Sequence, residues 1–228
     1  MRDFLIRPAN MPGYSVSAFF TTRQVPDDMK VLASYAGVGL QNIYLPMQKH
    51  TDAVQIVDTD LTPRIADAVV TNRAGLLIGV QTADCVPVLL FDAKRRVAGA
   101  VHAGWRSTAS GILRKALTVL CDRFYANPSD ILVAIGPAIC CDCYEVGPEV
   151  VDAVAGGTGA GAYITERGGK YHIDLRLANR LQAFSSGVLA RNIWQTADCT
   201  CCQPEKYYSY RHANSVTGRL CSMIVLKQ

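Results

Sequence analysis

The sequence has no apolar run long enough to cross a membrane and no strong net charge. Its longest apolar windows are interrupted by Gln81, Asp84 and Pro87, whereas a membrane-spanning helix needs about 20 consecutive apolar residues. Lys and Arg total 23 and Asp and Glu total 19, which leaves a net charge of +4. The densest basic run, at residues 94–96, fits a solvated turn. We therefore expect neither a membrane protein nor a nucleic-acid-binding protein.

A targeting segment is also missing from the first twelve residues. The apolar stretch there breaks off after Ile6, and the hydrophobic centre of a signal peptide does not follow. The chain nevertheless contains nine cysteines, which without a signal peptide are typical of reduced cytoplasmic thiols rather than a disulfide framework. Half of the 228 residues are apolar and 18% are charged. We expect a cytoplasmic protein that folds as one domain over residues 1–228.

The hydrophobic pattern predicts many short strands first and most of the helices afterwards. Short apolar runs predict strands at 14–20, 42–47, 53–58, 68–71, 76–80, 86–91, 97–101 and 131–135. Helices are predicted at 27–37, 109–124, 148–155 and 176–187, the last with Asp174 as N-cap. The Gly/Ala run 154–162 is interpreted as a flexible loop, since it lacks the Lys-Ser/Thr of a phosphate loop. This order indicates an α+β fold of mixed sheets of short strands flanked by helices.

Residues 82–112 contain the most informative pattern of the chain. Cys85 comes just before the predicted strand 86–91, and His102 comes just after the predicted strand 97–101. If these strands form a hairpin, the two side chains meet at its end. A thiol beside an imidazole can act as a nucleophile with its base or as a soft site for Zn or Cu. A buried apolar cysteine near an ordinary core histidine is the third interpretation.

An anion site is predicted next to this pair. Ser107 or Thr108 can cap the helix predicted at 109–124, and Arg106 precedes them. The free N–H groups of a helix N-terminus attract anions, and a guanidinium beside them strengthens that attraction. Further along, the run 207–211 combines three tyrosines with Arg211, which offers flat apolar faces and a second anion-binding side chain.

Two stretches of this region, TADCVPVLLFD and AVHAGWRSTASGI, resemble the signature stretches of the YfiH family. That family is also called laccase-domain or multicopper polyphenol oxidase, and more recently purine nucleoside phosphorylase. Further pieces are similar, in the same order, from about Phe19 to the C-terminus: QKHTDAVQIV, ADAVVTNRAGLLIGVQ, AIGPAI, YEVGPEV, DLRLANRLQAFSSGV and YYSYRHANSVTGRL. The resemblance implies a YfiH-like α+β domain, and it adds His50, in the Gln-x-His stretch, as a third ligand beside Cys85 and His102. Three protein ligands are what a catalytic zinc retains.

The resemblance further implies a zinc-dependent purine nucleoside phosphorylase, with adenosine deamination as a second activity. Its substrates would be phosphate together with adenosine, inosine, guanosine or methylthioadenosine. In this reading His50, Cys85 and His102 are both the metal ligands and the catalytic residues, and Arg106 and Arg211 are the phosphate or substrate ligands. The family usually has a second arginine where this chain has His212. Neither the residues nor the resemblance predicts the oligomeric state.

Three other functions remain open at this point. One is a copper-dependent polyphenol oxidase, although four histidines are too few for the several His-x-His motifs of a multicopper laccase. Another is an amide hydrolase that edits cell-wall precursors with Cys85 and His102 as nucleophile and base. The last is a binding module for a metal or a nucleotide without catalysis. Metal content and reaction products distinguish these alternatives.

The remaining cysteines suggest a second metal site. C-x-x-C spacings occur at Cys140/Cys143 and at Cys199/Cys202, and two such pairs can hold a structural zinc. The glycines of zinc knuckles are missing from both pairs, so we interpret these residues as buried free thiols and keep the structural zinc as the alternative. The cysteines at 140, 141, 201 and 202 depart from the family pattern. The sequence does not decide the roles of these cysteines: Cys140, Cys141, Cys143, Cys199, Cys201 and Cys202.

Overall fold

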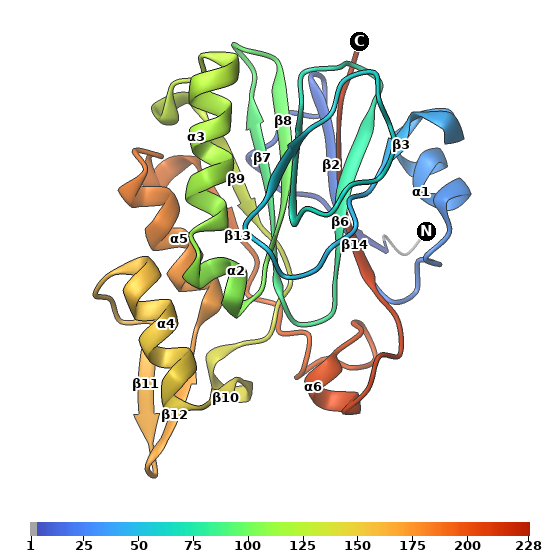
Figure 1. Ribbon diagram of the computed structural model, residues 1–228. Helices are drawn as coiled ribbons and strands as arrows, with labels where there is room; N and C mark the ends of the chain where they lie inside the picture. Colours follow the sequence, from blue (N-terminus) through green and yellow to red (C-terminus); the bar gives the residue numbers. More distant parts are fainter. Residues whose placement is uncertain (1–3) are drawn as a thin grey trace.

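Two mixed β-sheets lie face to face between two layers of helices in the computed structural model, which describes residues 4–228 (Figure 1). One sheet is covered by α2 (Trp105–Ala109), α3 (Ile112–Phe124), α4 (Pro148–Thr158) and α5 (Leu175–Ser185). The other sheet is covered by α1 (Met29–Ala36). The predicted α+β class, with mixed sheets of short strands flanked by helices, is confirmed. Residues 1–3, part of the stretch examined for a targeting signal, lie outside the described residues.

The sheet under the four helices has six strands. In spatial order they are β13 (Ile193–Gln195), β9 (Leu132–Ile135), β7 (Val86–Asp92), β8 (Val97–Ala103), β5 (Ala68–Thr71) and β4 (Val54–Ile56). The central pairs are antiparallel, whereas β13 with β9 and β4 with β5 are parallel. Val88 and Leu90 of β7 pack toward the helices, and Leu89 and Phe91 pack toward the second sheet. The continuous apolar run at 86–91 therefore reflects a strand buried on both faces.

The second sheet has five strands and receives the C-terminal end of the chain. Its order is β1 (Leu5–Ile6), β2 (Val16–Thr21), β14 (Leu220–Leu226), β6 (Leu77–Thr82) and β3 (Ile43–Tyr44). The central strand, β14, was not predicted, although its seven residues are all buried. Met223 and Val225 pack toward α1, while Ile224 and Leu226 pack between the sheets. Six apolar residues in a run of seven, interrupted only by Ser222, were the signal for this strand.

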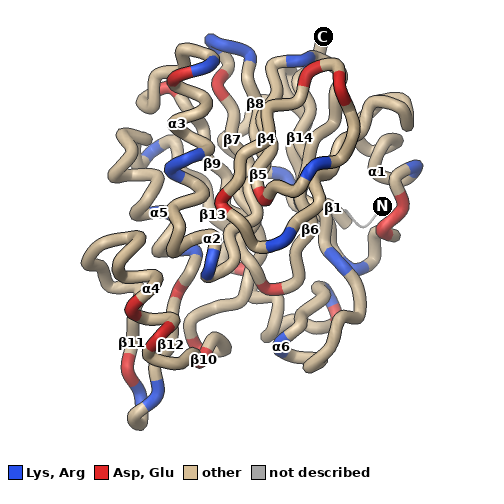
Figure 2. The backbone as a smooth tube through the Cα atoms, viewed as in Figure 1, with Lys and Arg blue, Asp and Glu red and all other residues tan. Residues whose placement is uncertain are grey.

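A small antiparallel sheet and a short helix lie near one end of the main sheets. The small sheet contains β10 (Glu145–Val146), β12 (Lys170–Ile173) and β11 (Ile164–Arg167), and the short helix is α6 (Tyr210–Ala213). Both lie in the lower part of Figure 1. Within residues 4–228, no helix has both the length and the apolar character that a membrane crossing requires. Figure 2 shows Lys and Arg interspersed with Asp and Glu in that view.

Two of the predicted helices differ from the structure. The helix predicted at 109–124 begins only at Ile112, as α3, because Gly111 adopts a left-handed φ of 72° between it and the separate short helix α2. Gly104 is the N-cap of α2, so the cap predicted at Ser107 or Thr108 is wrong, and both of those residues are buried inside α2. The loop predicted at 154–162 is also wrong as far as Thr158, since α4 continues to that residue. Small residues there allow α4 to approach α2 closely.

Candidate metal centre and its pocket

The predicted hairpin brings Cys85 and His102 to the same place. Strand β7 pairs antiparallel with β8, with Pro87 opposite His102 and Val86 opposite Ala103. Cys85 precedes β7 directly, and so it lies beside the last residues of β8. This register converts a long sequence separation into neighbouring side chains, as predicted for a hairpin.

His50 joins these two side chains from the loop after β3. The ligand atoms of His50, Cys85 and His102 all lie within 4.8 Å of one another. The Nε2 atom of His50 is 4.0 Å from the Cys85 Sγ atom, and the two imidazole rings meet edge to face with 4.8 Å between their centroids. In a tetrahedral zinc site, nitrogen and sulfur ligand atoms are roughly 3.5 Å apart. The three donors therefore need only a small contraction to bind one ion, and their types suit Zn or Cu.

Asp67 supports this group from behind, and the sequence did not reveal its role. Its carboxylate is fully buried, and its Oδ1 lies 2.7 Å from Nδ1 of His102. The same carboxylate accepts hydrogen bonds from the backbone N–H groups of Lys49, His50 and Thr51 and from the Thr51 hydroxyl. A carboxylate on one ring nitrogen holds a ligating histidine so that the other nitrogen faces the metal. Asp67 thus orients His102 and the loop that carries His50.

The charges of these groups favour an ionised thiol. Burial alone raises the pKa of Cys85, but the neighbouring imidazoles of His102 and His50 outweigh burial and lower it. Burial likewise lowers the pKa of His102, but Cys85 and the Asp67 carboxylate outweigh burial and raise it. Hydrogen bonds from His102 and Thr51 hold the pKa of Asp67 below its usual range despite its burial. A thiolate is the form of cysteine that binds metal, and a metal ion would replace the proton shared with His102.

Unusual backbone conformations occur on both sides of the group. His50 has φ of 57° and Asp84 has φ of 87°, in the left-handed region that residues with a Cβ atom rarely adopt. The Asp84 carboxylate accepts hydrogen bonds from the Thr200 hydroxyl at 2.6 Å and the Arg211 backbone N–H at 2.7 Å. These contacts stabilise the turn that presents Cys85. Strain of this kind is typical of functional sites.

The three donors line a pocket of about 790 Å³. Its wall contains both flat apolar groups and cationic groups: Trp105, Tyr144, Tyr210, Arg106, Arg211 and Arg219. Tyr144 was not singled out from the sequence. The expected stacking residues Tyr207 and Tyr208 are not among the lining residues, because Tyr207 is buried with its hydroxyl on Asp198 and Tyr208 lies under Arg23. Only Tyr210 of the predicted aromatic group lines the pocket.

The two predicted anion-binding arginines differ in how much they are engaged. Arg211 donates from Nη1 to the Cys143 carbonyl at 3.1 Å and from Nη2 to the Glu145 carbonyl at 3.0 Å. Arg106 lies in the first turn of α2, with its guanidinium 4.2 Å from the centroid of the Trp105 ring. Within residues 4–228 Arg106 forms no side-chain hydrogen bond or ion pair. Its donors therefore remain available to an anion in the pocket.

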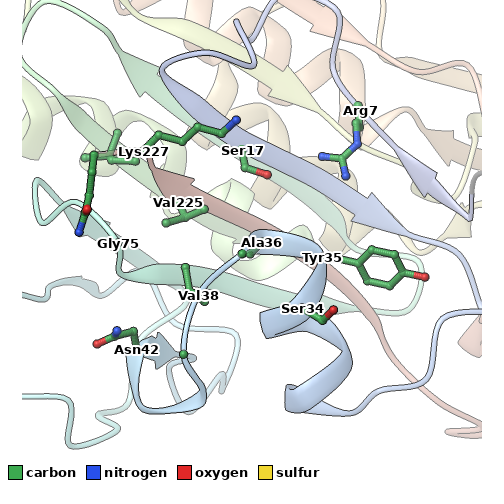
Figure 3. A pocket seen from close by; sticks show the side chains of 14 residues that line it. Arg7, Ser17, Ser34, Tyr35, Ala36, Val38, Asn42, Gly75, Val225 and Lys227 are labelled. Atoms are coloured by element: carbon green, nitrogen blue, oxygen red, sulfur yellow. The ribbon is translucent and has the colours of Figure 1, made fainter.

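A second pocket of about 740 Å³ lies elsewhere on the molecule. Figure 3 shows its labelled lining residues, among them Arg7, Tyr35 and Lys227, between α1 and the strands beside it. None of its lining side chains is a histidine, cysteine or carboxylic acid. This second pocket therefore offers no side chain suited to binding a metal ion as a soft ligand or to acid–base catalysis near neutral pH.

Comparisons with known proteins identify a family and several relatives of the chain. A family model described as multi-copper polyphenol oxidoreductase laccase matches residues 20–227. The chain is 37% identical over 209 residues to adenosine deaminase RL5 of an unknown prokaryotic organism, covering 86% of this chain and 79% of that protein. It is 36% identical over 189 residues to the purine nucleoside phosphorylase of Aquifex aeolicus, covering 82% of this chain and 85% of that protein. The crystal structure of YlmD from Geobacillus stearothermophilus superimposes with a TM-score of 0.89 at 28% identity, covering 100% of this chain and 98% of that one.

Proposed function

The chain belongs to the YfiH-like family described as multi-copper polyphenol oxidoreductase laccase, and from this premise we propose that it is a zinc-dependent enzyme acting on purine nucleosides. The reactions are phosphorolysis to a free purine base and pentose 1-phosphate, and deamination of adenosine. Adenosine, inosine, guanosine and methylthioadenosine are the candidate substrates. Residues 1–228 act as a single catalytic domain. The observation that carries this function is the convergence of two imidazoles and a thiolate in a pocket with aromatic and guanidinium groups.

The metal ligands in this proposal are His50, Cys85 and His102. A zinc ion on these side chains would supply Lewis acidity and an activated water molecule. Asp67 holds the proton on Nδ1 of His102, so that Nε2 keeps its lone pair for the ion. The same carboxylate holds the backbone of His50 in its left-handed conformation through the N–H contact.

The remaining wall suits the two parts of the reaction. Trp105, Tyr144 and Tyr210 offer flat faces on which a purine base can stack. Arg106 has unused donors for a phosphate ion, and a guanidinium binds phosphate with two parallel hydrogen bonds. Arg211 is the next candidate, since it lines the same pocket. A volume of about 790 Å³ falls in the usual range for small-molecule sites.

A Cys–His amide hydrolase is the second candidate, because the lowered pKa of Cys85 beside His102 also suits a nucleophile and its base. A multicopper oxidase is less well supported. Within residues 4–228 the structure groups potential metal ligands in two places, and only one of these contains histidine. A polyphenol substrate would also have no need of the arginines.

The deciding experiment incubates the protein with adenosine, with and without phosphate, and separates the products. Adenine with ribose 1-phosphate only in the presence of phosphate supports phosphorolysis, and inosine in both samples supports deamination. Elemental analysis of the same preparation identifies the metal. Both activities and the zinc ion of this site should be lost in Cys85→Ala and kept in Cys121→Ala, a matched control on α3 that does not line the pocket.

Other outcomes select the alternatives. Copper with oxygen uptake on phenols would select the oxidase. Metal-independent amide hydrolysis that is abolished by thiol alkylation would select the hydrolase. A protein that holds zinc at the site but leaves every purine nucleoside unchanged would refute the proposed activity.

A further inference from the structure

Four cysteine side chains that the proposed function does not use converge at a second place. Cys140 and Cys143 follow β9, and Cys199 and Cys202 follow β13. Their sulfur atoms all lie within 4.8 Å of one another. An isolated parallel bridge between Ala138 and Cys199 holds the two loops side by side. All four are free thiols.

The sulfur–sulfur distances suit an ion with tetrahedral coordination. The Cys143 and Cys202 sulfurs are 3.3 Å apart, and those of Cys140 and Cys202 are 3.9 Å apart. With zinc–sulfur bonds of about 2.3 Å, the edges of a tetrahedral tetrathiolate site measure roughly 3.8 Å. The observed separations lie on both sides of this value. Each loop contributes a C-x-x-C pair, the spacing that structural zinc sites use.

Backbone donors also point at one of the sulfurs. The N–H of Cys140 lies 3.2 Å from the Cys199 Sγ atom, and the N–H of Cys202 lies 3.4 Å from it. Two N–H donors on one sulfur stabilise a thiolate far better than a neutral thiol, which is only a weak acceptor. The surroundings of Cys199 are therefore those of an ionised ligand.

We propose that Cys140, Cys143, Cys199 and Cys202 bind one zinc ion as a closed tetrathiolate site, separate from the site at His50, Cys85 and His102. With four protein ligands the ion has no open position, so its role is structural. The sequence favoured buried free thiols, but Cys202 is exposed and Cys140 and Cys143 are half-buried, and the proposal takes up the structural zinc kept as the alternative.

The ion would hold one wall of the substrate pocket. The Cys143 carbonyl accepts a hydrogen bond from Arg211, and Thr200, next to Cys199, donates to the Asp84 carboxylate. Asp84 in turn accepts from the backbone of Arg211. The loop of Cys143 is thus hydrogen-bonded to a pocket arginine, and the loop of Cys199 is hydrogen-bonded to the turn that presents Cys85. Loss of the ion should loosen this wall without removing any ligand of the first site.

Metal stoichiometry tests the site on the full-length protein, expressed with added zinc and purified under reducing conditions. The wild type should contain two zinc ions per chain, Cys85→Ala one, Cys143→Ser one, and the double variant none. Cys141→Ser and Cys201→Ser are matched controls, since both residues lie in the same loops outside the cluster. They should retain two ions. Since Cys85→Ala empties only the first site, failure of the proposed function and failure of this inference give different results.

Cobalt provides a second measurement that does not need a cluster variant to fold. Cys85→Ala reconstituted with Co²⁺ should show the intense thiolate-to-cobalt charge-transfer band of a tetrathiolate site. Cys202→Ser in the same background should lose that band, and Cys201→Ser should keep it. Absence of the band in Cys85→Ala, or zinc content in Cys143→Ser equal to that of Cys141→Ser, would overturn the inference. A Cys143–Cys202 disulfide found by mass spectrometry in the wild type expressed with added zinc would do so as well, because it leaves neither sulfur as a thiolate ligand.

Discussion

Gly104 lies where a single methyl group should disturb the first metal site and little else. A Cβ atom at this position would lie 3.0 Å from Cδ2 of His50 and 3.1 Å from Sγ of Cys85. The backbone of Gly104, with φ of −71° and ψ of 173°, is accessible to alanine. Gly104→Ala should therefore leave the backbone unstrained and place its methyl group between two proposed ligands.

The size of the effect follows from these distances. Unbonded carbon atoms approach no closer than roughly 3.5 Å without repulsion, so the imidazole and the thiolate must each retreat by about half an ångström. Ligand distances in metal sites are kept within about 0.2 Å. We expect zinc affinity to fall by about 10–100-fold, comparable to losing a supporting group, or about 1.4–2.7 kcal/mol. The fold should lose no more than about 1 kcal/mol from the altered helix cap.

Competition with a chromophoric zinc chelator measures the affinity, and thermal unfolding of the metal-free protein reports on the fold. Gly13→Ala is the matched control, because nothing lies within 4 Å of a Cβ atom there, and it should bind zinc like the wild type. If Gly104→Ala binds zinc at this site as tightly as the wild type while Cys85→Ala has lost the zinc of this site, His50 and Cys85 do not converge on one ion as the structure indicates.

Three further predictions concern the pocket, the helices and pH. Arg106→Ala should raise the KM for phosphate about tenfold or more in phosphorolysis assays, with little change in thermal stability; an unchanged KM would move the anion site to another residue. In α4, Gly156→Ala should stabilise by about 0.5–1 kcal/mol in urea unfolding, because its Cβ meets nothing. Its neighbour Gly157→Ala should destabilise by about 1–3 kcal/mol, because its Cβ would overlap a carbonyl oxygen of α2; equal effects would refute this helix contact. Burial raises the pKa of Asp198, but hydrogen bonds from a lysine and a tyrosine outweigh burial and lower it. The contribution of this carboxylate to folding stability is therefore present above its unfolded pKa and is lost as pH falls through its folded pKa. Asp198→Asn should thus be less stable than the wild type by about 1 kcal/mol or less at neutral pH and equally stable in acid, and a difference that persists in acid would exclude the carboxylate as its source.

The central part of the site could be predicted from the sequence because it depends on local pattern. A continuous apolar run at 86–91, a polar turn and a second run at 97–101 specify a hairpin, and a hairpin determines which of its residues are opposite each other. Cys85 and His102 were placed together for this reason alone, and the register of β7 with β8 confirms that placement. His50 came only from family resemblance, since no local pattern relates it to the hairpin.

Other residues of the site depended on contacts that no local pattern records. Asp67 precedes β5, and only the pairing of Ala68 with Val101 brings its carboxylate to His102. Tyr144 and Arg211 meet over the pocket although they belong to distant segments. The four clustered cysteines converge because β13 pairs in parallel with β9, which carries the loops that follow them in the same direction.

Hydrophobic periodicity therefore predicted many of the longer strands and helices, such as β7, β8 and α5, because burial constrains every residue of such an element. The spatial order of the strands cannot be deduced from such a local pattern. The placement of β14 between β2 and β6, and of β13 beside β9, follows from how the complete apolar faces pack together. The proximity of side chains on different strands is a property of that packing, and only the tertiary structure decided it.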